Sequence, residues 1–163
     1  MAAAGNSAGG AERFKAALAQ GGWNHEIVVL PDSTRTAKEA ALAVGCDVAQ
    51  IVKSLVSRGT TSARPVLVIA SGANRVDETA VGALIGEPIG KADADFVRAN
   101  TGFAIGGVAP IGHVVAPVTL VDEDLLAFDS IWAAGGTPNT VFNLTPAELL
   151  EMTGGEPAAV KQH

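Results

Sequence analysis

The chain has 163 residues, of which 48% are hydrophobic and 17% are charged, and its formal net charge is −6. The length suits one domain with a sizeable core, and the composition excludes the disordered and fibrous classes. The acidic balance excludes a protein that depends on nonspecific attraction to nucleic acid phosphates. A single cysteine, Cys46, excludes an internal disulfide, so we expect a cytoplasmic protein.

Two stretches of the chain have no charged residues, and we expect neither to be a signal peptide or a membrane span. Residues 1–10 are mostly Ala, Gly and Ser and carry no charge, which indicates a flexible tail before a domain over 11–163 rather than a signal peptide. Ala99 to Val121 carries no Asp, Glu, Lys or Arg and is long enough to span a bilayer. Its glycines and prolines would leave backbone groups unsatisfied in lipid, so we predict buried strands and a tight loop there.

The remaining patterns predict a mixed α/β chain in one domain, without a linker or an internal repeat. Thr36 and Glu39 have capping-box spacing, and Pro146 suits the first position of a helix. Residues 66–71 are almost wholly apolar, which indicates a central strand. Helices are predicted over 11–20, 36–45, 77–85, 93–100 and 145–154, and strands over 25–30, 55–57, 66–71, 118–121, 131–134 and 141–143.

A glycine-rich segment, Gly102 to His113, interrupts the most apolar part of the sequence with four glycines and Pro110. Glycine permits positive φ and a close approach of the backbone, while proline fixes φ, so this segment has a shape to hold. Its N–H groups could bind negative charge on a reacting oxygen. The alternative is a plain turn between two buried strands.

Lys53 is the second candidate, because it stands among aliphatic residues directly after a predicted helix. Its stem could cover apolar surface with the ammonium in water, which is a structural role. Beside the glycine-rich segment, it could instead hold a substrate.

Other catalytic motifs are absent from the sequence. The glycine-rich segment lacks G-x-G-x-x-G spacing, and 86–92 resembles a P-loop but lacks one residue and the magnesium-binding hydroxyl. His25, His113 and His163 lie far apart without zinc-ligand spacing, so we expect neither metal nor cofactor. Ser71 lacks the nucleophile-elbow frame. Cys46 lies at a predicted helix C-terminus beside Asp47, which disfavours a thiolate.

Three blocks of the sequence together resemble the YbaK/ProX-like aminoacyl-tRNA editing domains, which also occur beside prolyl-tRNA synthetases. The first block runs from Thr36 to Val56 and resembles the family's helix and lysine-bearing segment. The second, Gly106 to His113, is similar to its glycine-x-x-x-proline loop. The third, Ser130 to Asn139, resembles its later strand and glycine-threonine turn. The resemblance covers roughly residues 12 to 155, with one departure at Ala109, where relatives often have a second proline.

The resemblance implies a compact mixed sheet, partly closed like a barrel, with helices outside. It implies a trans-editing deacylase that hydrolyses the ester of a mischarged tRNA, with tRNA(Pro) carrying a small wrong amino acid as the expected substrate. The expected partners are the 3′ end of the aminoacyl-tRNA and a prolyl-tRNA synthetase, without a metal or a membrane. The catalytic positions implied are Lys53, Gly106, Gly107 and Pro110. The substrate-binding positions implied are Thr36, Ser71, His113, Gly135, Thr137 and Asn139.

Two alternatives remain open: a non-catalytic module that binds aminoacyl-tRNA, a nucleotide or a synthetase, and a small esterase unrelated to tRNA. Ordinary turn chemistry is the structural alternative for Gly135, Thr137 and Asn139. Asp122, Glu123 and Asp124 are expected to form a solvated helix start away from the site. The basic residues expected to gather around a pocket are Arg13, Arg35, Lys38, Lys53, Arg58, Lys91 and Arg98.

Overall fold

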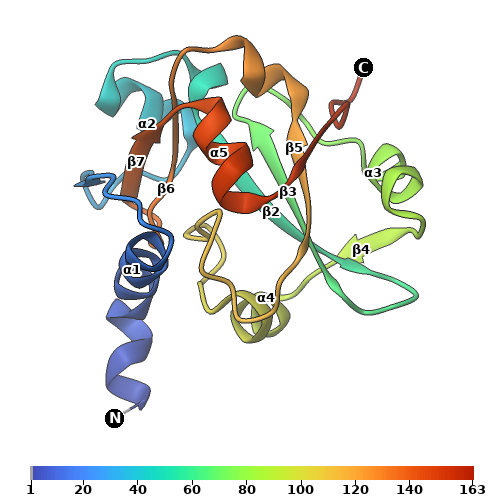
Figure 1. Ribbon diagram of the computed structural model, residues 1–163, viewed down its shortest axis with the longest axis horizontal. Helices are drawn as coiled ribbons and strands as arrows, with labels where there is room; N and C mark the ends of the chain where they lie inside the picture. Colours follow the sequence, from blue (N-terminus) through green and yellow to red (C-terminus); the bar gives the residue numbers. More distant parts are fainter. Residues whose placement is uncertain (1) are drawn as a thin grey trace.

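The computed structural model describes the backbone of residues 2–163 and the side chains of residues 9–163 (Figure 1). The α-helices are α1 (Ala2–Gln20), α2 (Ala37–Val44), α3 (Glu78–Ile85), α4 (Ala94–Thr101) and α5 (Pro146–Thr153), and the short 3₁₀ helices are η1 (Val48–Gln50) and η2 (Glu123–Ala127). The strands are β1 (Ile27–Val29), β2 (Val52–Gly59), β3 (Pro65–Ser71), β4 (Ile89–Lys91), β5 (Val118–Asp122), β6 (Ile131–Ala134), β7 (Thr140–Leu144) and β8 (Glu156–Ala158). The predicted mixed α/β class is confirmed.

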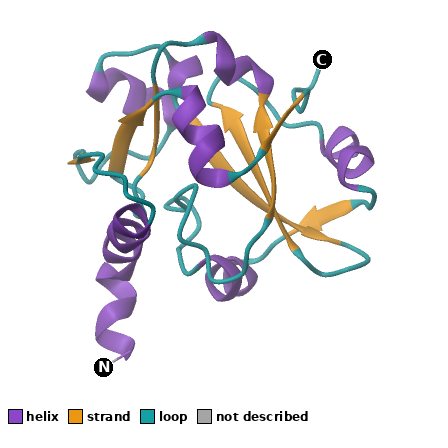
Figure 2. Ribbon diagram, in the orientation of Figure 1, coloured by secondary structure: helices purple, strands orange, loops and turns teal. Residues whose placement is uncertain are grey.

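The larger sheet has five strands in the order β4-β2-β3-β5-β8 (Figure 2). All seven residues of β3 are buried, which confirms the central strand predicted from its apolar sequence. β2 is antiparallel to β3 along its length but pairs with β4 only over Ser57 to Gly59. The first half of β2 therefore has one open edge.

The smaller sheet has three antiparallel strands in the order β1-β7-β6. It meets the larger sheet through one isolated bridge, between Ile51 and Trp132. Because this single bridge does not extend into a ladder, the two sheets do not close, and the expected partly barrel-like sheet is wrong in that respect.

The main core joins α1, the two sheets and the segment after α4. Phe14 of α1 is fully buried, and its ring lies 4.6 Å from that of Phe142 in β7. Phe103, Leu149 and Leu125 are also buried in this cluster. Truncating a buried Phe commonly costs about 3–5 kcal/mol, so α1 contributes substantially to the stability of the domain.

Most local predictions agree with the structure. Thr36 with Glu39 and Thr145 with Glu148 form complete capping boxes at α2 and α5. α1 begins at Ala2 rather than near residue 11; the mobility predicted for 1–10 stays a prediction. Two short strands, β4 and β8, were missed because three residues carry little periodic signal.

The apolar run from Ala99 to Val121 forms the end of α4, an irregular segment and most of β5. Within residues 2–163, no helix is long and apolar enough to cross a membrane.

Candidate functional site

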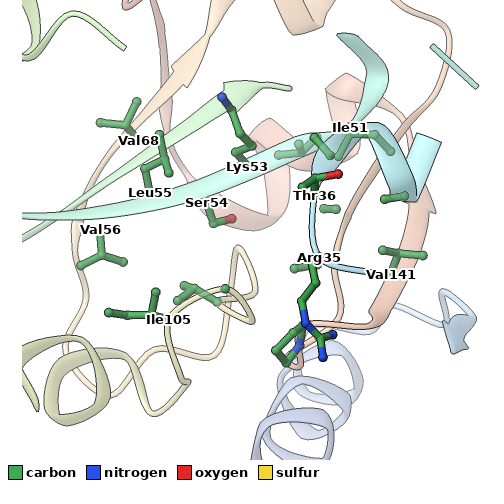
Figure 3. A pocket seen from close by; sticks show the side chains of 18 of the residues that line it. Arg35, Thr36, Ile51, Lys53, Ser54, Leu55, Val56, Val68, Ile105 and Val141 are labelled. Carbon is green, nitrogen blue, oxygen red and sulfur yellow. The ribbon is translucent and has the colours of Figure 1, made fainter. Parts of the chain in front are cut away.

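A cavity of about 800 Å³ lies along the open edge of β2 (Figure 3). The start of α2, strands β6 and β7 and the glycine-rich segment supply its other walls. Its volume is within the usual range for small-ligand sites, and most of its wall is aliphatic. The polar or charged residues of the wall are Thr34, Arg35, Thr36, Lys53, Ser54, Ser57, Glu78, Lys91 and Thr140.

The open edge of β2 presents backbone hydrogen-bonding groups to this cavity. Gly59 N–H donates to Arg64 O and Gly72 N–H donates to Ile51 O, which fixes the odd-numbered residues as those bonded to β3. The N–H and C=O groups of Ser54 and Val56 therefore point away from β3. The Ser54 hydroxyl is also buried without a hydrogen-bond partner. Sequence reasoning missed Ser54, whose only signal is its position beside Lys53.

Lys53 reaches the cavity from the other side of the strand. Successive side chains alternate, so Lys53 and Leu55 lie on one face of β2, and Ser54 and Val56 on the face toward Ile105, as Figure 3 shows. The Lys53 ammonium donates to the backbone oxygen of Asn74 at 2.7 Å. The cavity extends over both faces at the strand edge, so a ligand lying there can meet Lys53 and the glycine-rich segment together.

The groups around Lys53 have opposite effects on the pKa of its ammonium. Burial lowers the pKa of Lys53 below its ordinary value, the guanidinium of Arg75 lowers it further, and the Asp122 carboxylate raises it. Asp122 is fully buried, so the expectation of a solvated position away from the site is wrong for this residue. The predicted helix start itself is confirmed, because Asp122 caps η2 by accepting from Asp124 N–H.

Ser71 lies behind the site rather than in the cavity wall. Its hydroxyl donates to Ala49 O at 2.7 Å, and its N–H donates to Asp122 Oδ2 at 3.0 Å. Only 1% of Ser71 is exposed. Its hydroxyl therefore serves the local fold, and Ser71 connects the end of β3 to the end of β5.

The glycine-rich segment places Gly106 and Val108 in the cavity wall. Gly106 has φ +88°, a backbone conformation that favours glycine. Gly107 N–H donates to Ala104 O at 2.9 Å, so this donor serves the segment itself. Across the part of the chain that the structure describes, the N–H groups of Gly106 and Val108 have no protein acceptor. Gly106 and Val108 therefore each contribute an unpaired backbone donor to the cavity wall.

Pro110 and His113, which follow Val108 in the chain, are not part of the cavity wall. Pro110 is buried, and His113 Nε2 lies 2.7 Å from Ala109 O. Since the carbonyl only accepts, Nε2 carries the hydrogen, and Nδ1 is left buried without a partner. Burial lowers the pKa of His113, the bond to Ala109 opposes this change, and the Arg13 charge adds to it. Arg13 also donates to Gly112 O, which ties α1 to the segment.

The turn between β6 and β7 contacts the glycine-rich segment through its backbone. A Cβ atom on Gly107 would lie 2.8 Å from the Thr137 Cα, so these two backbones touch. Gly135 N–H donates to Thr140 O at 2.7 Å, while Asn139 Nδ2 donates to Leu30 O at 3.0 Å. The polar groups of this turn are used within the fold, and Pro138 supplies the cavity wall.

Thr36 lines the cavity, although its hydroxyl already accepts from Glu39 N–H as the cap of α2. Of the expected basic residues, Arg35, Lys53 and Lys91 line the cavity. Arg58 instead lies over the Phe96 ring, 5.8 Å from its centroid. Among the described residues, no group of three or more His, Cys, Asp or Glu side chains could hold a metal ion.

The surroundings of Cys46 fit a structural role for this residue. Burial raises the pKa of its thiol, and the neighbouring Asp47 charge raises it further. The reactive thiolate is therefore disfavoured, in the direction predicted from the sequence.

Comparison with known proteins places this chain in one family. Residues 31–152 match the family described as "Aminoacyl-tRNA editing domain". The chain is 31% identical over 133 residues to the uncharacterized protein YwhH of Bacillus subtilis (strain 168), an alignment that covers 80% of this chain and 84% of YwhH.

Two solved structures agree closely with the whole fold. One, described as "a putative trans-editing enzyme for prolyl tRNA synthetase", has a TM-score of 0.90 at 48% identity and covers 94% of this chain and 98% of its own. The hypothetical protein APE2540 has a TM-score of 0.83 at 29% identity and covers 92% and 99%. The chain belongs to the aminoacyl-tRNA editing domain family, and its class of activity is aminoacyl-tRNA deacylation.

Proposed function

We propose that this protein is a trans-acting deacylase that hydrolyses the ester between a small wrong amino acid and the terminal ribose of tRNA(Pro). The observation that carries the proposal is that one cavity is lined by Lys53, by Ser54 and by Gly106 and Val108, whose N–H groups are unpaired. The structure at 48% identity, described as "a putative trans-editing enzyme for prolyl tRNA synthetase", supports the choice of tRNA and suggests a synthetase as partner.

The reaction needs charge stabilisation more than a protein nucleophile. Water adds to the ester carbonyl and forms a tetrahedral oxyanion, which collapses as the ribose oxygen leaves and takes a proton. The N–H groups of Gly106 and Val108 bind the oxyanion, and each such donor typically contributes about 3 kcal/mol in the transition state. Amino acid and uncharged tRNA are the products.

Lys53 acts at the other side of the β2 edge. Its ammonium holds the ribose or the terminal phosphate and offsets negative charge, while the Ser54 hydroxyl and the open backbone edge orient the aminoacyl group. Burial lowers the pKa of Lys53, but we assign it no role as a general base. A charged donor at this position suits the polyanionic end of a tRNA on a protein of net charge −6.

The aliphatic wall favours a small side chain. Ala37, Ala40 and Ala133 line the cavity together with Val52 and Val141. This part of the wall is built from small aliphatic side chains and suits a small aminoacyl group, so alanine, serine and cysteine are the candidates to test. Discrimination by one methylene is worth only about 1–3 kcal/mol.

The experiment is deacylation of tRNA(Pro) carrying alanine, serine, cysteine or proline, with Lys53→Ala beside the wild type. We expect hydrolysis of at least one mischarged species and its loss in Lys53→Ala, with the melting temperature nearly unchanged. Full activity in Lys53→Ala would refute the role of the lysine. Binding of charged tRNA without hydrolysis across the panel would instead identify a non-catalytic module, and turnover of simple esters without tRNA preference would identify a small esterase.

A further inference from the structure

The ammonium of Lys53 is held by a turn that a buried carboxylate fixes in place. Its acceptor is the backbone oxygen of Asn74, a residue that is only 8% exposed. The Asn74 side-chain amide donates to Asp122 Oδ2 and to Asp124 Oδ2, each at 2.8 Å. Asp122 Oδ2 also accepts from Ser71 N–H at 3.0 Å. One carboxylate therefore joins both ends of the turn from Ser71 to Asn74.

Asp122 is a fully buried carboxylate, and its burial is unfavourable for stability unless other groups compensate its charge. A buried carboxylate is costly unless hydrogen bonds and an opposite charge compensate it. Asp122 accepts three N–H donors, from Ser71, Asn74 and Asp124. No ion pair to Asp122 within 4.0 Å occurs among the side chains of residues 9–163. The charge of Asp122 is thus left to act on the cations nearby, of which Lys53 is one.

Charged groups lie beside the turn from Ser71 to Asn74 and in the wall of the cavity that holds Lys53. Arg75 follows the turn, Glu78 opens α3 and lines the same cavity, Asp122 ends β5, and Asp124 lies in η2. Arg75 and burial both disfavour the ammonium, whereas Asp122 favours it. Asp122 also accepts hydrogen bonds from Ser71 and Asn74, and the Asn74 carbonyl is the acceptor of Lys53.

We propose that Asp122 is the positioning residue of Lys53: it fixes the Asn74 carbonyl that orients the ammonium, and its buried charge acts on that ammonium. The consequence for turnover rests on the proposed deacylase function, but the effect on Lys53 itself does not. Asp122 touches no substrate in this assignment and acts through Asn74 and Lys53.

The first test measures the ionisation of Lys53 in Asp122→Asn, which removes the charge with little change of shape. The chain has five lysines, so reductive ¹³C-methylation followed by NMR titration can resolve them, with Lys53→Arg assigning the signal. We expect the pKa of Lys53 to fall relative to the wild type, because the carboxylate that favours the ammonium is removed. Glu123→Gln is the matched control, because it removes an exposed charge from the adjacent residue. An unchanged pKa of Lys53 in folded Asp122→Asn would overturn the proposal.

The second variant, Asn74→Ala, keeps the backbone acceptor of Lys53 but removes the side-chain amide that binds Asp122 and Asp124. This variant tests the same proposal if Asp122→Asn does not fold. We expect a loss of about tenfold in kcat with little change in KM, because the turn is no longer tied. Wild-type kcat in folded Asn74→Ala would contradict the positioning role.

The two proposals fail in distinguishable ways. If the wild type deacylates no tRNA, the proposed function is refuted, while the NMR titration still decides whether Asp122 controls Lys53. If the wild type is active, the alkaline limb of kcat/KM, corrected for spontaneous hydrolysis, moves to lower pH in Asp122→Asn by the same amount as the pKa of Lys53. A limb that stays in place while the pKa moves would refute the link to turnover.

Discussion

Alanine substitutions at Gly106 and Gly107 test two different requirements for glycine in the glycine-rich segment. Gly107 is required for a close backbone contact, and Gly106 for a positive φ. Gly107 is buried, and an added Cβ would lie 2.8 Å from both Cα and C of Thr137 and 3.0 Å from Pro138 Cδ. Ordinary contacts of this kind begin at 3.4 Å, so the two backbones must separate by about 0.6 Å. Gly106 has open space around its added Cβ and instead has φ +88°.

The expected magnitudes follow from these geometries. A misplacement of about 1 Å can cost about 100-fold in rate, so Gly107→Ala should lower kcat by about 10- to 100-fold. In Gly106→Ala the left-handed backbone costs about 1–2 kcal/mol, which lowers the melting temperature by about 2–8 °C. Its turnover should also fall, because relief of the strain changes the orientation of the Gly106 N–H, which is a proposed oxyanion donor.

Gly86→Ala is the matched control for Gly106→Ala. Gly86 also has φ +88° with nothing within 4 Å of an added Cβ, but it caps α3 outside the main cavity. We expect a similar drop in melting temperature with wild-type deacylation. The assay is single-turnover release of the amino acid from mischarged tRNA(Pro), with thermal unfolding in parallel. Wild-type kcat in Gly107→Ala would refute the argument that contact with the Thr137 turn sets the position of the donors.

Three further predictions concern charge and pH. Lys53→Met keeps the aliphatic stem, so it should abolish turnover without lowering the melting temperature, because burial disfavours the ammonium it removes; a clearly lower melting temperature would contradict this. The pKa of His113 is lowered in the fold, so its contribution to stability is complete above pH 6.5 and is lost as the pH falls below that value. His113→Gln, which can still donate to Ala109 O, should flatten this part of the melting-temperature profile, and an unchanged slope would speak against it. The pKa of Glu87 is lowered to about 2 by bonds from Ser62 and Thr61, so its contribution is present above pH 4.5 and is lost toward pH 2. Glu87→Gln should remove that acid-dependent loss in urea titrations, with Glu123→Gln as an exposed control.

Local features of the sequence determined most of the elements. The spacing of Thr36 and Glu39 sets the start of α2, and Pro146 suits the first turn of α5, because capping depends on residues three positions apart. The apolar run over β3 identified the central strand for a similarly local reason: a strand covered on both faces needs no polar side chains. The three sequence blocks also carried the family resemblance, which the comparison with known proteins confirms.

The tertiary structure decided how these parts combine. The acidic run at Asp122 looked solvated, yet the chain brings Asp122 against Ser71, 51 residues earlier, and the donors there compensate its burial. The open edge at Ser54 exists because β4 pairs with only the far end of β2. The contact of Gly107 with Thr137 likewise depends on the packing of two distant segments. Sequence patterns encode backbone conformation and periodicity over a few residues, whereas the burial of a charge, an unpaired strand edge and a backbone contact depend on partners that only the folded chain supplies.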